Sequence, residues 1–147
     1  LEGPHVMYCD KVDPSGDSAP RAFRMRLDAH SCALGKAMLA HKSLEELKEI
    51  YKSYSLYKHT PNTITTLDKL NSELRKIRQL GYSINEAETF DYVYGVGTAI
   101  LDAQGRAIAA ISLSGTKGSI NVKTIPILAK KVIETSLKIS SKLSDDH

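Results

Sequence analysis

The chain has 147 residues, which corresponds to one ordinary domain with room for a sizeable hydrophobic core. Hydrophobic residues make up 41% and charged residues 25%, which is typical of a globular protein and excludes a disordered one. The net charge of +3 is too small, and the basic residues are too scattered, to indicate nucleic-acid binding. No signal peptide or bilayer-spanning apolar run is present, so we expect a soluble, cytoplasmic chain with no membrane partner.

The first 40 residues predict two strands and a helix. His5–Val12 is typical of a strand, and Ala22–Leu27 alternates apolar side chains with arginines, as half-buried strands do. The loop between them is rich in turn-forming residues. His30–Ala40 is rich in small residues and predicts a helix. Gly35 costs this helix about 1 kcal/mol relative to Ala, so we expect a strand or a ligand to approach it closely.

Two amphipathic helices are predicted next. The first begins with a capping box from Ser43 to Glu46, followed by apolar residues at helical spacing. A loop over Leu56–Thr65 leads to the second helix, which starts within residues 65–68 and ends at Gly81. The chain then becomes extended and enters an acidic stretch that we expect to be a loop.

The segment 95–115 predicts a β-hairpin with a tight turn at Asp102–Gly105. Its strands are predicted over Val96–Leu101 and Ala107–Leu113, and alternation assigns their side chains to two faces. One face collects small residues and hydroxyls, namely Gly95, Gly97, Ala99, Ala110, Ser112 and Ser114. Such a face accommodates either a small polar guest or the close approach of another backbone.

A last helix follows the hairpin. Asn121 can cap it, but Pro126 requires either that the helix starts near Thr124 or that its first turn is distorted. Its predicted inward face consists of Ile125, Leu128, Val132, Ile139 and Leu143. We expect residues 144–147 to form a frayed tail. Together the elements predict an α+β fold in which helices pack on an antiparallel sheet.

Several catalytic motifs are missing. Ser112 and Ser114 lie within a strand, and no G-x-S-x-G elbow is present, which argues against a serine hydrolase. The Gly95-Val96-Gly97 sequence lacks a third glycine and opens a strand, which excludes a dinucleotide-binding motif. We therefore expect a domain that is not an enzyme.

Two cysteines and two histidines raise the question of a zinc site. His5, Cys9, His30 and Cys32 have suitable donor atoms and would converge if the first strand lay beside the segment around His30. Their spacings, H-x₃-C and H-x-C, match no structural-zinc pattern. We therefore expect both cysteines to be small buried hydrophobic residues and the protein to need no cofactor. A redox or metal-dependent enzyme that uses Cys9 and Cys32 remains the alternative.

Four segments taken together resemble the effector-binding domain of the IclR family of bacterial transcriptional regulators. They are HSCALGKAMLA (30–40), TPNTIT (60–65), GYSINEAETFDYVYGVGTAILDAQGRAIAAISLSG (81–115) and the final helix. Their order and spacing both match the family pattern, whereas the first 29 residues match it only loosely. The resemblance implies a single domain over 1–147 with a fold similar to GAF and profilin-like domains, in which helices cover both faces of a curved antiparallel sheet.

The resemblance also implies a function. It indicates a sensor of a small organic acid or sugar acid that forms dimers or tetramers and biases DNA binding by another domain. The winged helix-turn-helix domain that binds DNA in this family is absent from the chain, so we expect no DNA binding by this chain itself. A dimerisation module with no ligand, whose small-residue face is filled by packing, is a further alternative.

By position, the family's ligand contacts fall on Ala33, Leu34, Gly35, Asn85, Glu88, Gly95, Ser112 and Ser114. Main-chain N–H groups at residues 33–35 would meet a carboxylate, and the serine hydroxyls would complete a polar end. The chain departs from the family pattern where Asn85 replaces an Asp, Ala87 replaces one of a pair of acids, and Gly95 replaces a Cys. We expect the lost charge to favour a more anionic ligand and the glycine to enlarge the pocket.

Overall fold

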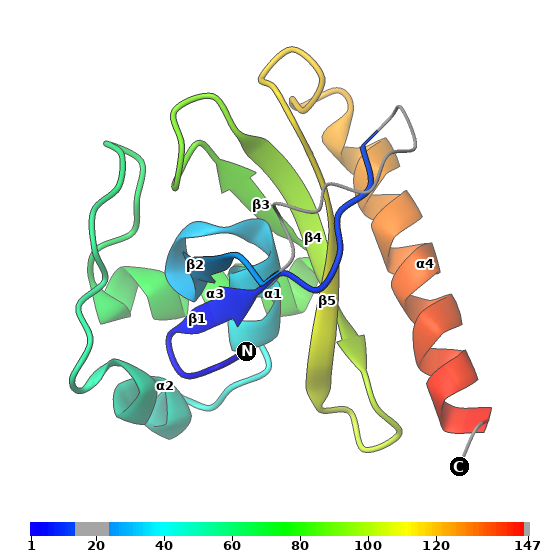
Figure 1. The fold of residues 1–147 in the computed structure, drawn as a ribbon, viewed down its shortest axis with the longest axis horizontal. Helices are drawn as coiled ribbons and strands as arrows, with labels where there is room; N and C mark the ends of the chain where they lie inside the picture. Colours follow the sequence, from blue (N-terminus) through cyan, green and yellow to red (C-terminus); the bar gives the residue numbers. More distant parts are fainter. Residues whose placement is uncertain (14–23, 146–147) are drawn as a thin grey trace.

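The computed structural model describes residues 1–13 and 24–145. Its centre is an antiparallel sheet with the strand order β3 (Ser83–Glu86), β4 (Tyr94–Leu101), β5 (Ala107–Gly115). Helix α1 (Ala33–Leu39) packs on one face of this sheet, and helix α4 (Ile125–Asp145) packs on the other (Figure 1). The predicted α+β class, with helices on both faces of an antiparallel sheet, is confirmed.

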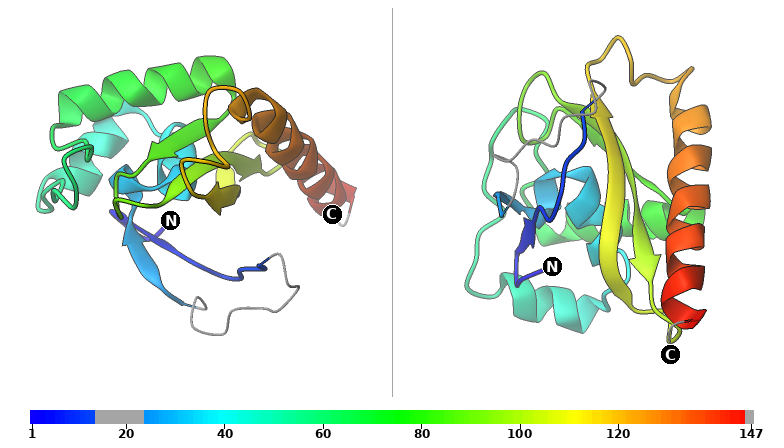
Figure 2. Two further views of the ribbon diagram at one scale, coloured as in Figure 1. Left: turned by 90° about the horizontal axis from the view of Figure 1, so that it is seen from above. Right: turned by 45° about the vertical axis from the view of Figure 1, so that its right-hand side comes forward.

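The N-terminal strands form a second sheet and do not join the first. β1 (His5–Met7) pairs with β2 (Arg26–Asp28), and both strands are shorter than the sequence predicts. Backbone hydrogen bonds extend the ladder as far as Arg24, whose N–H donates to the carbonyl of Tyr8 at 2.8 Å. This ladder projects away from the main sheet (Figure 2). Most of the loop predicted between the strands lies outside the described residues.

The predicted first helix is divided in two. A 3₁₀ turn, η2 (Ala29–Ser31), comes first, and α1 begins only after Cys32, whose Sγ accepts a hydrogen bond from Gly35 N at 3.4 Å. A Cβ at Gly35 would overlap the carbonyl oxygen of Ala29. The close approach expected at this glycine is therefore confirmed, but the neighbour is the backbone of the preceding 3₁₀ turn and not a strand or a ligand.

The next two helices follow the prediction closely. α2 (Leu44–Tyr51) opens with the expected capping box, in which Glu46 N donates to Ser43 Oγ at 3.1 Å and Ser43 N donates to Glu46 Oε2 at 2.7 Å. α3 (Leu67–Leu80) ends at Gly81, which takes the left-handed conformation with φ of 83°. This conformation is accessible to glycine at no steric cost, so the residue acts as the predicted stop.

The hairpin confirms its predicted turn. Asp102 Oδ1 accepts hydrogen bonds from Gln104 N and Arg106 N, at 3.0 and 2.9 Å, and Gly105 has a φ of 76°. Both strands are longer than predicted, and β5 runs on to Gly115. The hairpin alternates as expected: Ala110 packs toward the core around α1, whereas Ile111 packs toward α4.

Helix α4 starts where Pro126 requires it to start, directly after Thr124. Its buried positions include Val132 and Ser136, but the predicted inward residue Leu143 is 39% exposed. Ser140 Oγ accepts a hydrogen bond from Leu101 N, at the end of β4, and Leu143 lies about one turn beyond this contact. The predicted frayed tail is also corrected, since residues 144 and 145 are still helical.

Two hydrophobic clusters hold these layers together. The larger lies among α1, α2, α3 and the N-terminal strands, with Leu39, Leu47, Leu70 and Leu74 fully buried. The smaller lies between the main sheet and α4 and includes Val96 and Val132. Within the described residues, every helix is too short or too polar to cross a membrane.

Replacement of Gly35 by Ala is expected to destabilise the domain by about 3 kcal/mol or more, because the new Cβ would overlap backbone atoms. Urea unfolding measures the difference. Gly118→Ala is the matched control, since its Cβ would meet nothing closer than 3.7 Å, and we expect a change within about 0.5 kcal/mol. A loss at Gly35 no larger than the control's would contradict the close approach.

Candidate functional site

The small-residue face of the sheet faces helix α1. The strand register places Gly97 beside Ser112 and Ser83, and a Cβ at Gly97 would lie 3.2 Å from atoms of Ala33. Ser83 Oγ donates a hydrogen bond to the Ala33 carbonyl at 2.6 Å, which fixes the start of α1 on this face. At Gly97, therefore, the small residue serves close packing.

The adjacent row of the sheet is more open. Gly95 pairs with Ser114 and Asn85, and a Cβ at Gly95 would lie 3.6 Å from Ala33 Cβ, an ordinary contact distance. Ser112 is half-buried and Ser114 is exposed. Neither hydroxyl makes a hydrogen bond within the described part of the chain. Two free hydroxyls therefore lie on the same face as the first turn of α1.

Only some of the eight predicted site residues lie together on one side of the sheet. Ala33, Asn85, Gly95, Ser112 and Ser114 share the α1 side of the sheet. Leu34 is half-buried beside them, in contact with the larger core. Gly35 is buried against the Ala29 backbone, so its main role is in packing.

Asn85 and Glu88 have partners inside the protein. Asn85 Oδ1 accepts a hydrogen bond from Glu88 N at 3.0 Å, which braces the acidic loop. Both carboxylate oxygens of Glu88 lie 2.9 Å from Lys36 Nζ. Burial raises the pKa of the Glu88 carboxyl, and the Lys36 ammonium opposes that rise. These interactions order the loop beside the site. A ligand would have to displace Lys36 to bind the Glu88 carboxylate, whereas Asn85 uses only its carbonyl oxygen in the contact with Glu88.

Lys36 is the residue that the sequence analysis missed. It is 1% exposed, and its ammonium also contacts Ile84 O at 2.6 Å and Glu73 Oε1 at 3.3 Å. One cation thereby joins α1, α3, β3 and the acidic loop. A lysine among the apolar residues of a predicted buried helix is the signal that would have revealed it.

The TPNTIT segment holds the acidic loop from its other side. Thr60 Oγ1 donates to Ala87 O, and Thr63 Oγ1 donates to Glu88 O, both at 2.6 Å. Ala87 has a φ of 54°, which is unfavourable for a residue with a Cβ. The two threonines account for this motif, since they support a loop whose backbone is in a costly conformation.

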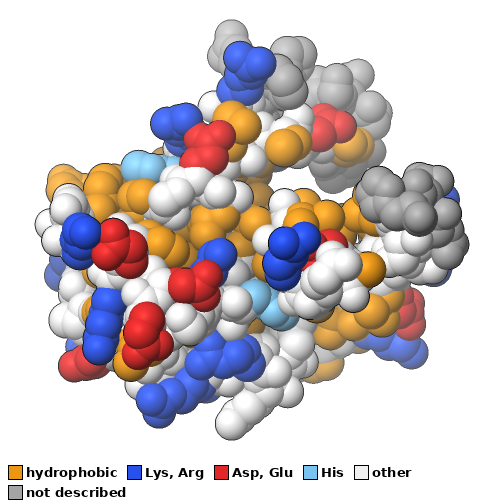
Figure 3. All heavy atoms as spheres, turned by 90° about the horizontal axis from the view of Figure 1, so that it is seen from below, with side chains coloured by type: hydrophobic (Ala, Val, Ile, Leu, Met, Phe, Trp, Pro, Cys, Tyr) orange, Lys and Arg blue, Asp and Glu red, His pale blue; other side chains and the backbone are white. Residues whose placement is uncertain are grey.

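One face of the molecule is indented. Figure 3 shows a notch on this face, with hydrophobic side chains along part of it. Tyr8, in the N-terminal ladder, is near Cys32 at the start of α1: burial raises the pKa of the Tyr8 hydroxyl to about 12, and the Cys32 sulfur adds to the rise. Tyr8 therefore brings the N-terminal segment close to the start of α1.

A separate cavity of about 430 Å³ lies between α3 and the edge strand β3. Its lining includes three carboxylates, from Glu73, Glu86 and Glu88, and two lysines, Lys36 and Lys76. The ammonium of Lys36 is already surrounded by oxygens, so the carboxylates outnumber the remaining cation and the lining suits an anionic ligand poorly. The cavity is also not lined by any of the predicted serines.

The possible zinc set does not assemble. Cys9 is exposed, contrary to expectation, whereas Cys32 is buried and caps α1. Burial raises the pKa of the Cys32 thiol to about 12, the opposite of what a reactive cysteine needs. His5 Nε2 lies 3.0 Å from Tyr54 Oη, while His30 Nε2 donates to the carbonyl of Tyr57 at 3.0 Å.

Comparison with known families gives a direct match. The family model described as "Bacterial transcriptional regulator IclR C-terminal" matches residues 1–141, which include the N-terminal segment whose motifs resemble the family only loosely. The chain belongs to this family. It is therefore a regulatory, effector-binding type of domain, in agreement with the expectation that it is not an enzyme.

Individual relatives are regulators of the same kind. The chain is 33% identical over 118 residues to the HTH-type transcriptional repressor AllR of Klebsiella pneumoniae, a match covering 80% of this chain and 43% of that protein. It is 27% identical over 146 residues to the transcriptional regulator XynR of Escherichia coli, covering 97% and 57%. The chain thus spans about half the length of the curated relatives it matches.

Solved structures confirm the fold. The Thermotoga maritima IclR structure matches with a TM-score of 0.87 and 36% identity, covering 97% of this chain and 58% of that one. The inducer-binding domain of PobR from Acinetobacter, a double mutant in complex with 3-hydroxybenzoic acid, matches with a TM-score of 0.79 and 24% identity, covering 95% and 83%. The GAF and profilin-like architecture implied by the sequence is therefore confirmed.

Lys36→Met is expected to destabilise the domain by about 3–5 kcal/mol, because the buried carboxylate of Glu88 loses its partner. Urea unfolding measures the loss. Glu73→Gln is the control: the Glu73 side chain is 26% exposed against 6% for Glu88, and the amide oxygen of the glutamine can still accept from Lys36, so we expect a smaller loss, about 1 kcal/mol. Equal losses in the two variants would show that the buried pair does not hold the segments together.

Proposed function

We propose that the chain is a ligand-sensing domain that binds a small organic acid or sugar acid on the α1 side of its sheet. The observation that carries this proposal is the pair of unpartnered hydroxyls, Ser112 and Ser114, beside the first turn of α1. A half-buried hydroxyl is stabilised by a hydrogen bond, and a ligand with several oxygen atoms can accept that bond.

The surroundings supply the rest of a carboxylate-binding site. The first N–H groups of a helix have no partners within it, so those of Ala33 and Leu34 are suitable donors to an anion. The nearby Glu88 is neutralised by Lys36 and so repels an anionic ligand less. Gly95 contributes no side chain and leaves room beside Ser114.

The relatives support the same chemical class. The PobR inducer-binding domain was solved with 3-hydroxybenzoic acid, a small aromatic carboxylate. AllR and XynR are named as regulators of transcription. We propose that the ligand binds two conformations of the domain with different affinity, and that this difference biases DNA binding by an N-terminal domain. We further propose that the protein acts as a dimer or tetramer in the cytoplasm.

The rival functions make different predictions. A redox enzyme based on Cys9 and Cys32 requires an accessible thiolate, and the raised pKa of Cys32 opposes it. A dimerisation module without a ligand is favoured by the packing of Ala33 over Gly97. A module without a ligand does not explain why the sheet stays open at Gly95 and Ser114.

A thermal-shift screen separates these functions. The chain is incubated with small carboxylates, including 3-hydroxybenzoate and gluconate, and with their amide or alcohol analogues. We expect at least one carboxylate to raise the melting temperature and its uncharged analogue to do so less, because only a ligand of the native state stabilises it. Equal shifts from charged and uncharged compounds would point away from an anion-binding site.

Ser112→Ala is expected to weaken binding of that carboxylate by about 1–2 kcal/mol, because one hydrogen bond to the ligand is lost. Isothermal titration calorimetry on the folded variant gives the affinity. Ser53→Ala, at an exposed position after α2, serves as the control and should bind as the wild type does. Unchanged affinity at Ser112 would remove this hydroxyl from the site.

A further inference from the structure

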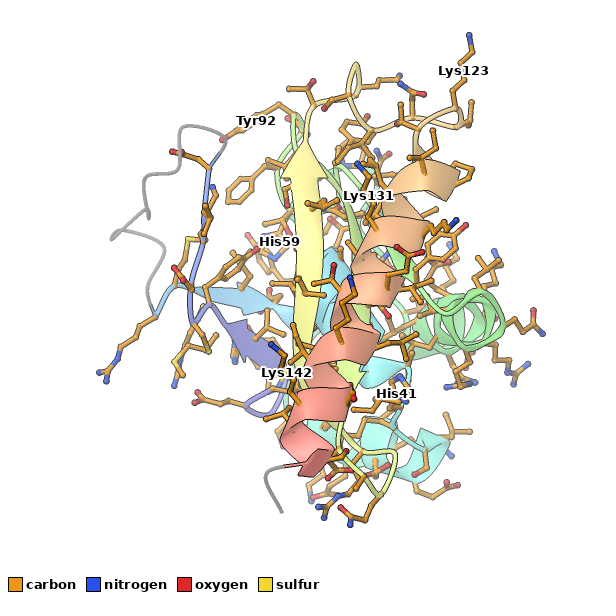
Figure 4. The ribbon with its side chains drawn as sticks, turned by 90° about the vertical axis from the view of Figure 1, so that its right-hand side faces the viewer. His41, His59, Tyr92, Lys123, Lys131 and Lys142 are labelled. Atoms are coloured by element: carbon orange, nitrogen blue, oxygen red, sulfur yellow. The ribbon has the colours of Figure 1, made fainter. Side chains whose placement is uncertain are left out.

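A cluster of histidines and one aspartate lies apart from the small-residue face. Asp28, His30 and His59 each place one metal-ligand atom within 4.8 Å of those of the other two. Asp28 ends β2, His30 lies in η2, and His59 comes from the loop between α2 and α3. No other group of three such residues occurs within the described chain. Figure 4 shows His59 on the side of the sheet that carries the N-terminal ladder.

Two of the three side chains are buried. His30 is fully buried, and its Nε2 donates to Tyr57 O, so its Nδ1 carries a lone pair. That Nδ1 has no hydrogen-bond partner. A buried nitrogen without a partner is costly, and each such atom requires an explanation. It is the observation that separates this cluster from an ordinary hydrogen-bonded histidine pair.

The other two residues are already paired with each other. His59 Nε2 donates to Asp28 Oδ2 at 2.7 Å, and Asp28 Oδ1 accepts from Tyr54 Oη at 2.9 Å. His5 Nε2 lies 3.3 Å from the same Oδ1. The carboxylate is therefore held in place by groups on its far side, as ligating carboxylates are in metal sites.

We propose that Asp28, His30 and His59 form a binding site for a divalent transition-metal ion of the zinc type. The ion takes one ring nitrogen from each histidine and Oδ2 of Asp28, replacing the proton that now joins His59 to Asp28. Ligand atoms around a tetrahedral zinc lie roughly 3.3 Å apart, so shifts of about 1 Å assemble the site. Two imidazoles and a carboxylate suit zinc, nickel or cobalt and suit calcium or magnesium poorly.

The site is open on one side. The His59 side chain is 27% exposed whereas that of Asp28 is 8% exposed, so the ion enters past His59 and keeps its fourth position for water. Neither cysteine belongs to this cluster. The ion would tie η2 to the α2–α3 loop, which in turn holds the acidic loop through Thr60 and Thr63.

Zinc retention by the tag-free chain tests the proposal. The chain is stripped with a chelator, exposed to zinc, passed over a desalting column and analysed for metal. We expect one zinc per chain for the wild type and a loss in affinity of at least about tenfold for Asp28→Asn and His59→Ala. Retention of zinc by His59→Ala, or failure of the wild type to retain it, overturns the proposal.

Two controls keep the result specific. His41→Ala removes a histidine that lies apart from His59 in Figure 4 and should leave zinc binding unchanged. Circular dichroism verifies that each variant is folded, and His59 is exposed enough for its loss to be tolerated. Cobalt substitution identifies the ligands: we expect visible bands of a four-coordinate ion and no thiolate charge-transfer band. A thiolate band would assign the metal to a cysteine and contradict the site.

Discussion

The buried ammonium of Lys36 is the interaction on which the architecture around the site depends. It is held by Glu88, Glu73 and the carbonyl of Ile84, so one charge joins α1, α3, β3 and the acidic loop. An unpaired charge at this depth would cost several kcal/mol, which ties the positions of these four segments to one another. The start of α1 is fixed in the same way, because Ser83 holds the Ala33 carbonyl.

This constraint explains why the α1 side of the sheet is part packing surface and part open site. Ala33 closes over Gly97, where a side chain would not fit. At the neighbouring residue pair of the sheet, Gly95 and Ser114 do not make that contact. The hydroxyls of Ser112 and Ser114 have no hydrogen-bond partner among the described residues. The same strand pattern thus serves close packing at one end and, in the function we propose, ligand binding at the other.

Local signals predicted most of the elements. The capping box at Ser43, the stop at Gly81 and the turn at Asp102 depend on neighbouring residues, which the sequence shows directly. The sequence could not show which partners a side chain finds across the fold. The ion pair of Lys36 with Glu88 spans 52 positions, and the cluster of Asp28 with His59 spans 31. The sequence therefore could not show that Asn85 and Glu88 each have a partner within the protein. Nor could it show the exposure of Leu143, which lies about one turn beyond the contact of α4 with the end of β4.

Backbone amide NMR of the ¹⁵N-labelled chain, titrated with the carboxylate that stabilises it most, tests the central claim most directly. Binding on the α1 side of the sheet predicts shifts at residues 33–34 and at Gly95, Ser112 and Ser114, with little change along the outer face of α4. Shifts that instead gather along α4, or around the cavity between α3 and β3, would contradict the assignment of the site.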